Sequence, residues 1–336
     1  MSFKNALVSV LAFVTITGCS ESSTMLVPKG IPPEGYTEKP SGLQNFNPKV
    51  DILFVIDSSY SMDEAQDNLK LNAYKFADAL AKSPILDYHV GVLTTDMSSC
   101  RTNCGKLQGV PAFLHKNTPN LVSVLSSRLV VGTGGSAEEM MFSPVIEALS
   151  PALETRENKG FYRQDAYLAV IIITDAKEQS KYSPEEMHDF LVQKKGDARR
   201  VLGYGVIRKL ADTGCTSGNE PLDGKLEDFL MLVENGNARQ ENVLSLCTEN
   251  YGEKLAEFAN DIVSRSAGTV KLSRLPKENT IRVTYGTQII PNNLYKGWTF
   301  RSSSNTLEFG KDIEWSVQPD GTSVTIDFEV LDTRGN

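Results

Sequence analysis

Histidine is scarce in this chain, with three residues in 336, and they stand far apart in the sequence at positions 89, 115 and 188. A zinc site needs histidine or cysteine ligands that converge, and this spacing gives no sign of such a cluster. The sequence also contains no Gly-x-Ser-x-Gly and no His-Glu-x-x-His motif. We therefore expect no enzyme, and a metal-dependent hydrolase, in which Mg²⁺ would activate water, is the least favoured alternative.

Positive charge is also in deficit. The chain has 34 lysines and arginines against 42 acidic residues, a formal net charge of -8, and no long basic run, which argues against a nucleic-acid partner. The glycine cluster at 132–135 leads into a helix expected to begin near Ser136. It lacks the Gly-Lys-Ser/Thr ending of a phosphate-binding loop, so we expect no nucleotide either.

Hydrophobic runs of membrane-spanning length are absent. Near the start, residues 6–16 form a mostly apolar run that follows Lys4. This run is too short to cross a bilayer core of about 30 Å, and it predicts a signal peptide over residues 1–18. The following Ile-Thr-Gly-Cys sequence resembles the lipobox of bacterial lipoproteins. The resemblance implies cleavage before Cys19, lipidation of its thiol and, because Ser20 stands where an aspartate would retain the protein, an outer-membrane destination. The alternative is an ordinary secretory signal.

Cysteine is limited to five residues, and removing Cys19 leaves Cys100, Cys104, Cys215 and Cys247. An even number in an exported protein suggests disulfides, and four cysteines permit three pairings that the sequence alone does not distinguish. The pairing Cys100–Cys104 with Cys215–Cys247 is preferred, because each bond would close a segment that looks like a loop or a loop plus a helix.

The rest of the chain divides into three parts. Residues 19–48 are rich in serine, proline, glycine and charge, which predicts a flexible tether. Residues 49–270 alternate apolar strand-like runs with amphipathic helical patterns, which predicts a doubly wound, mostly parallel sheet with helices on both faces. Residues 276–336 contain short alternating segments between turn residues, which predicts a small antiparallel β module.

The expected elements of the α/β part can be placed by residue. Strands are expected over 50–56, 89–95, 168–174, 201–207 and 242–247, and helices over 63–82, 183–194, 226–233 and 253–264. The helix after residue 183 has the clearest signals. Its sequence Ser-Pro-Glu-Glu offers an N-cap serine, a proline at the first position and a capping-box glutamate.

The first strand runs directly into a cluster of oxygen-bearing side chains, Asp57, Ser59 and Ser61. Asp96 and Asp175 follow two further strands. The carboxyl ends of parallel strands meet at one edge of a sheet, so these side chains are expected to lie together. Carboxylate and hydroxyl oxygens suit a small hard cation, and the sequence therefore predicts a Mg²⁺ site at this edge.

Three segments together resemble the von Willebrand factor type A family and its metal-ion-dependent adhesion site, in the variant found in integrin β subunits. They are the loop at 57–62, the strand end at 173–177 and the Ser-Ala-Glu-Glu sequence at 136–139. The resemblance covers about residues 49–266. It implies metal ligation by a set of five residues, Asp57, Ser59, Ser61, Glu138 and Asp175. Thr133 is the alternative to Glu138.

The resemblance also implies two flanking cation sites for Ca²⁺ or Mn²⁺. Asp63 and Glu64 would serve one of them, and Asp96 the other. The sequence departs from the family pattern at both, because Ala65 and Gly135 stand where acidic residues would be expected.

The expected function is binding. Two neutral serines among the ligands would leave the ion electrophilic, so a carboxylate of a protein partner could complete its coordination. The leading hypothesis is a lipid-anchored adhesin of the cell envelope, held to the membrane through Cys19. The second hypothesis is an envelope-assembly scaffold that binds its partner without using the ion.

Overall fold

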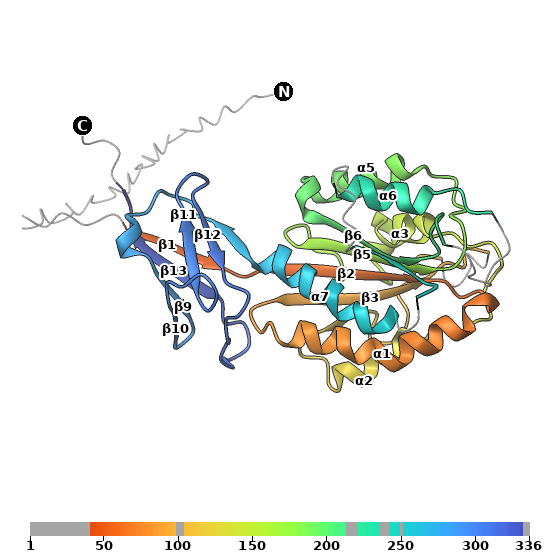
Figure 1. Ribbon diagram of the computed structural model, residues 1–336, viewed down its shortest axis with the longest axis horizontal. Helices are drawn as coiled ribbons and strands as arrows, with labels where there is room; N and C mark the ends of the chain where they lie inside the picture. Colours follow the sequence, from red (N-terminus) through yellow and green to blue (C-terminus); the bar gives the residue numbers. More distant parts are fainter. Residues whose placement is uncertain (1–40, 99–103, 213–220, 235–241, 249–250, 332–336) are drawn as a thin grey trace, which may run out of the picture. The chain divides into compact units, whose positions relative to one another are not determined.

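The computed structural model describes residues 41–98, 104–212, 221–234, 242–248 and 251–331. Its largest sheet has six strands in the order β4-β3-β2-β5-β6-β7, and all neighbouring pairs are parallel except β3 and β4 (Figure 1). The strands are β2 (Lys49–Ile56), β3 (Asp87–Thr94), β4 (Leu114–His115), β5 (Tyr167–Thr174), β6 (Val201–Ile207) and β7 (Val243–Ser245). The expected mostly parallel α/β sheet is confirmed.

Helices cover both faces of this sheet (Figure 1). One face packs against α1 (Asp63–Ala81), α2 (Leu121–Arg128) and α7 (Tyr251–Ala267), and the other against α3 (Phe142–Ala148), α5 (Pro184–Lys195) and α6 (Lys225–Val233). Strand β2 shows why. Ile52, Phe54 and Ile56 belong to the first hydrophobic cluster, and the alternate residues Leu53 and Val55 belong to the second. Successive strand side chains point to opposite faces, so an uninterrupted apolar run is buried on both.

The capping signals at the start of α5 act as the sequence predicts. The Ser183 amide donates to the Glu186 carboxylate at 2.8 Å, and the Glu186 amide donates to the Ser183 hydroxyl at 3.2 Å. Gly196 ends the helix in the left-handed conformation, with a φ of 69°. The helix therefore begins and ends where local chemistry satisfies its free backbone groups.

The β module consists of two antiparallel sheets, ordered β1-β13-β9-β10 and β11-β12-β8. Its strands are β1 (Ser41–Phe46), β8 (Thr269–Lys271), β9 (Arg282–Tyr285), β10 (Gln288–Ile290), β11 (Trp298–Arg301), β12 (Thr306–Phe309) and β13 (Val324–Glu329). Its first strand precedes β2, and the others follow α7. The α/β sheet is thus inserted, in sequence, into the β module.

Two expectations need correction. Residues 41–46, predicted to lie in the tether, form β1, which pairs along its whole length with β13. The helix expected near Ser136 begins only at Phe142, because residues 136–139 take part in the loop that Glu139 joins to Asp96 by a β-bridge. Signal peptide, lipidation site and most of the tether lie outside the described residues.

Candidate metal centre

The predicted acidic residues follow two neighbouring strands. β2 and β5 are parallel, with Ile56 opposite Ile173, and the Asp57 amide donates to the Ile173 carbonyl at 2.9 Å. Asp57 and Asp175 therefore stand at the same edge of the sheet, as the strand order requires. Both are buried, with exposed fractions of 0% and 1%.

Asp57 is fixed at both carboxylate oxygens. Its Oδ1 accepts from the Ser59 amide at 2.8 Å, and its Oδ2 accepts from the Thr174 hydroxyl at 2.6 Å. Thr174 is itself oriented, because its Oγ1 accepts from the Ala176 amide at 3.0 Å. Burial raises the pKa of Asp57, and these hydrogen bonds lower it in part. Asp57 is consequently a rigid acceptor that faces the end of β5.

A chain of polar contacts joins the rest of the predicted set. The Ser59 and Ser61 hydroxyls lie 3.0 Å apart, and the Ser61 hydroxyl donates to Asp175 Oδ1 at 3.1 Å. Asp175 Oδ2 is buried and has no hydrogen-bond partner among the described residues. Burial, and then the negative charge of Asp57, raise the pKa of Asp175. An unpaired carboxylate oxygen beside a second acid is an arrangement that a cation would complete.

Glu139, not Glu138, supplies the third carboxylate. Its exposed fraction is 6%, and its pKa is raised to about 7 by burial and by the charges of Asp57 and Asp175. The nearby Ser59 hydroxyl offsets part of this rise in pKa. Glu138 is exposed, and its amide donates to Ser136 Oγ at 3.0 Å. Of these two glutamates, only Glu139 is buried beside the cluster.

The segment after β5 holds Glu139 in place. The Gln179 amide group donates to Glu139 Oε2 at 3.0 Å, and the Gln179 backbone amide donates to the Glu139 carbonyl at 3.1 Å. The buried Glu178 carboxylate accepts from the Met141 and Phe142 amides, at 2.7 and 3.2 Å. The contacts of Gln179 and Glu178 therefore hold the loop before α3 at Glu139 and at the first residue of the helix, Phe142.

The glycine turn at 132–135 packs against the Asp57 loop. The Gln66 side chain donates to the Asp57 carbonyl at 2.9 Å and to the Gly132 carbonyl at 2.8 Å, and it accepts from the Gly132 amide. The Gly135 amide donates to the Ser58 carbonyl at 2.8 Å. A Cβ on Gly135 would lie 2.2 Å from Ser58 Oγ, so an aspartate does not fit there without movement.

Among the described residues, no hydrogen bond joins the side chains of the remaining predicted ligands to this cluster, although the backbone of Asp96 forms a β-bridge with Glu139. Thr133 is half-buried in the glycine turn, and no hydrogen bond in the described part of the chain joins it to the acids. Asp63 and Glu64 are exposed in the first turn of α1, while Asp96 accepts from the Ser98 amide and hydroxyl. The structure therefore brings together five oxygen-bearing residues, Asp57, Ser59, Ser61, Glu139 and Asp175.

The donor set is mixed in character. Across the residues that the structure describes, no three histidine, cysteine or acidic side chains converge closely enough to hold a metal by themselves. A cation at this edge would thus depend on the serine hydroxyls as well as on the carboxylates. Such all-oxygen surroundings suit Mg²⁺, Mn²⁺ or Ca²⁺.

Several positioning residues were not predicted from the sequence. Thr174 is the last residue of a predicted strand and belongs to no ligand motif, and Gln179 lies in a loop that carries no motif. Gln66 left a signal, because it is a polar residue at helical spacing from the buried apolar residues Leu69 and Ala73 of α1. A buried amide on an apolar stripe needs partners, and here they are the two loops of the site.

The cysteines are described only in part. Cys104 and Cys247 are disulfide-bonded. Their predicted partners, Cys100 and Cys215, lie outside the described residues, as does Cys19, so the pairing and the lipidation stay predictions. No helix in the described ranges is both long and apolar enough to span a membrane.

No protein-family model and no curated protein matches the sequence. Among solved structures, proximal thread matrix protein 1 from the mussel byssus, with a zinc-occupied MIDAS motif, is 14% identical with a TM-score of 0.36, and the match covers 65% of this chain and 48% of that one. The pilus adhesin SpaC from Lactobacillus rhamnosus GG is 11% identical with a TM-score of 0.42, and the match covers 87% of this chain and 41% of SpaC. A von Willebrand factor type A protein from Catenulispora acidiphila is 13% identical with a TM-score of 0.35, and the match covers 87% of this chain and 61% of that protein. The chain spans less than two thirds of each, and likeness at this level carries no conclusion about function.

Proposed function

We propose that this chain is a protein-binding module of the cell envelope that holds a divalent cation, Mg²⁺, at the carboxyl edge of its α/β sheet. The ligand set is Asp57, Ser59, Ser61, Glu139 and Asp175. The observation that carries the proposal is the unpaired, buried Asp175 Oδ2 beside two further buried acids whose pKa values are raised. Like charges at close range are costly unless a cation lies between them.

The chain's own residues set the character of the site. Thr174 and the Ser59 amide orient Asp57, and Gln179 orients Glu139. The serine hydroxyls contribute oxygen without charge. When bound, the cation supplies an electrophilic point to which a carboxylate of a partner protein would attach. No step of covalent chemistry is proposed, because the described site contains no histidine and no activated nucleophile.

The proposal extends to location. The lipobox-like sequence before Cys19 supports a lipid anchor at the outer membrane, so the module would present its cation at the envelope. The disulfides would be Cys100–Cys104 and Cys215–Cys247, which is consistent with the oxidised state of Cys104 and Cys247.

Titration calorimetry with MgCl₂ on the purified chain tests the proposal. We expect one bound ion per chain and a loss of at least about 100-fold in affinity for Asp175→Asn, because removing an ordering partner alone already costs 10–100-fold. Asp189→Asn, an exposed residue on α5, is the matched control and should bind normally. Absence of Mg²⁺, Mn²⁺ and Ca²⁺ binding would exclude the cation, and partner capture that survives EDTA would favour the scaffold hypothesis.

A further inference from the structure

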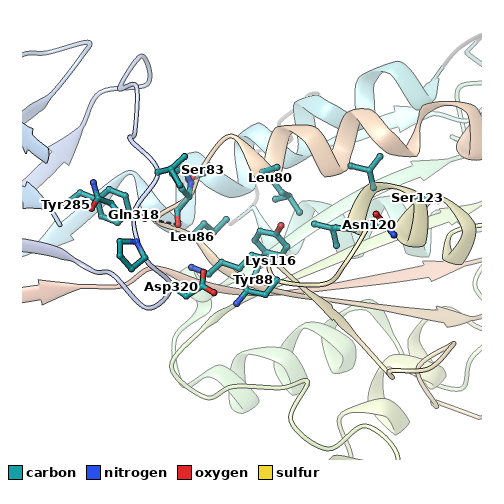
Figure 2. A pocket seen from close by; sticks show the side chains of 17 residues that line it. Leu80, Ser83, Leu86, Tyr88, Lys116, Asn120, Ser123, Tyr285, Gln318 and Asp320 are labelled. Atoms are coloured by element: carbon teal, nitrogen blue, oxygen red, sulfur yellow. Dashed lines mark hydrogen bonds between the residues drawn. The ribbon is translucent and has the colours of Figure 1, made fainter. Parts of the chain in front are cut away.

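A separate pocket of about 640 Å³ lies at the other edge of the α/β sheet (Figure 2). One of its lining residues, Tyr88, pairs with Val50 at the amino end of β2, whereas Asp57 follows the carboxyl end of that strand. The pocket is formed by the end of α1, the start of β3, the loop before α2 and part of the β module. Its apolar wall includes Leu80, Pro84, Leu86, Leu121, Val122 and Pro319.

The size and lining of this pocket fit a small molecule. Ligand sites commonly have volumes of about 300–1,000 Å³ and mostly apolar walls with a few polar groups. The wall is held by a contact between the two parts of the chain, because the Tyr285 hydroxyl donates to the Pro84 carbonyl at 3.3 Å. Both residues line the pocket.

Tyr88 provides the polar group that points to a ligand. Its exposed fraction is 2%, and its hydroxyl has no hydrogen-bond partner among the described residues. Burial raises its pKa to about 12, so the hydroxyl keeps its proton and is a donor. This hydroxyl lines the pocket and can donate to an acceptor atom placed there.

The charges at the pocket favour an uncharged occupant. Lys116 and Asp320 both line it, and they carry opposite charges. Lys116 is half-buried and Asp320 is exposed, and neither forms an ion pair with another described residue. Together they give the pocket wall no net charge, so neither sign of ligand charge is favoured. An anionic guest would be attracted by one of them and repelled by the other.

We propose that this pocket binds an uncharged, mostly apolar molecule of drug-like size that carries one acceptor oxygen, such as a ketone or ester, for the Tyr88 hydroxyl. The ligand would contact both the α/β sheet and the β module. This inference is independent of the cation site, which lies at the opposite edge of the sheet.

The neutral fluorescent ketone prodan is a suitable probe, since its emission reports both an apolar environment and a hydrogen bond to its carbonyl. Titrated into the purified chain with EDTA present, it should bind at one saturable site with a blue-shifted emission. Tyr88→Phe keeps the buried ring and should weaken binding about fivefold, the typical effect of one hydrogen bond, with a further blue shift. Ser123→Trp, which fills the pocket from α2, should weaken binding at least tenfold. Ser304→Trp, outside the pocket, should bind like the parent chain.

Three results would overturn this inference. The first is no saturable prodan binding by the folded parent chain. The second is equal binding by the parent, Tyr88→Phe and Ser123→Trp chains, with thermal unfolding showing that each is folded. The third is binding that falls as protein concentration rises, which would mean that a second copy of the chain covers the pocket.

Discussion

Replacing each of two adjacent glutamates in turn tests which of them binds the cation, since the structure favours Glu139 and the sequence pattern favours Glu138. In Glu138→Gln and Glu139→Gln the same charge is removed at neighbouring positions with the same change in shape. The structure places only Glu139 beside Asp57 and Asp175. We therefore expect Glu139→Gln to lose Mg²⁺ affinity and Glu138→Gln to retain it.

The size of the effect follows from burial. Two unit charges about 4 Å apart interact by about 4 kcal/mol at an effective dielectric constant of 20, and the cost of keeping the Glu139 carboxylate buried offsets part of this gain. A net loss of about 3 kcal/mol corresponds to about 100-fold in the dissociation constant. Glu138 is exposed and screened by solvent, so its loss should change the constant by less than about fivefold.

Calorimetric titration with MgCl₂ at low ionic strength measures both constants, and circular dichroism confirms that each variant is folded. The contact with Gln179 can persist in the Glu139→Gln variant, since the amide oxygen introduced at position 139 still accepts a hydrogen bond from the Gln179 side chain. Equal affinities for the two variants would refute the assignment of Glu139. A loss confined to Glu138→Gln would restore the residue that the family resemblance implies.

Three further predictions concern the support of the site. Thr174→Val should lower the free energy of unfolding by about 1–3 kcal/mol in urea titrations, because the buried Asp57 carboxylate loses a hydrogen-bond donor. Thr174→Ser keeps the hydroxyl and should retain most of the parent chain's stability. Equal stabilities of the Val and Ser variants would contradict this role. In metal-free protein, unfolding free energy should fall by about 1–2 kcal/mol as pH rises from about 4.5 to about 7. Across that range unfolded Glu139 is ionised while the folded carboxyl still holds its proton, and a profile unchanged by Glu139→Gln would exclude this cause. Gly135→Ala should destabilise the chain by about 1–3 kcal/mol, because its new Cβ would lie 2.2 Å from Ser58 Oγ. Gly134→Ala, with no atom within 4 Å of its new Cβ, should be nearly neutral. Thermal unfolding compares the two, and similar melting temperatures would show that the turn adapts to the Gly135 side chain.

Much of the fold was predictable because its signals are local. The strands β2, β5 and β6 are long apolar runs buried on both faces, and the start of α5 carries a complete capping box. Strand β1 was missed since its sequence, Ser-Gly-Leu-Gln-Asn-Phe, is polar and short. It forms because β13, which is nearly three hundred residues away, supplies its hydrogen-bond partners, and such long-range pairing leaves no trace in local pattern.

The candidate site shows the same division. Asp57, Ser59, Ser61 and Asp175 were predictable because each stands next to a well-marked strand. The choice between Glu138 and Glu139 depends on the path of the loop before α3, in which Glu139 is buried and forms a β-bridge with Asp96 while Glu138 is exposed. Spacing alone cannot provide that register.

The central claim is that one divalent cation binds among five residues at the carboxyl edge of the sheet, and anomalous scattering from crystals grown with MnCl₂ tests it most directly. Mn²⁺ can take the place of Mg²⁺ among oxygen ligands and has a usable anomalous signal. We predict one strong anomalous peak within bonding distance of both Asp175 and Glu139. Crystals with no anomalous density at this edge, at a Mn²⁺ concentration that saturates binding in solution, would contradict the claim.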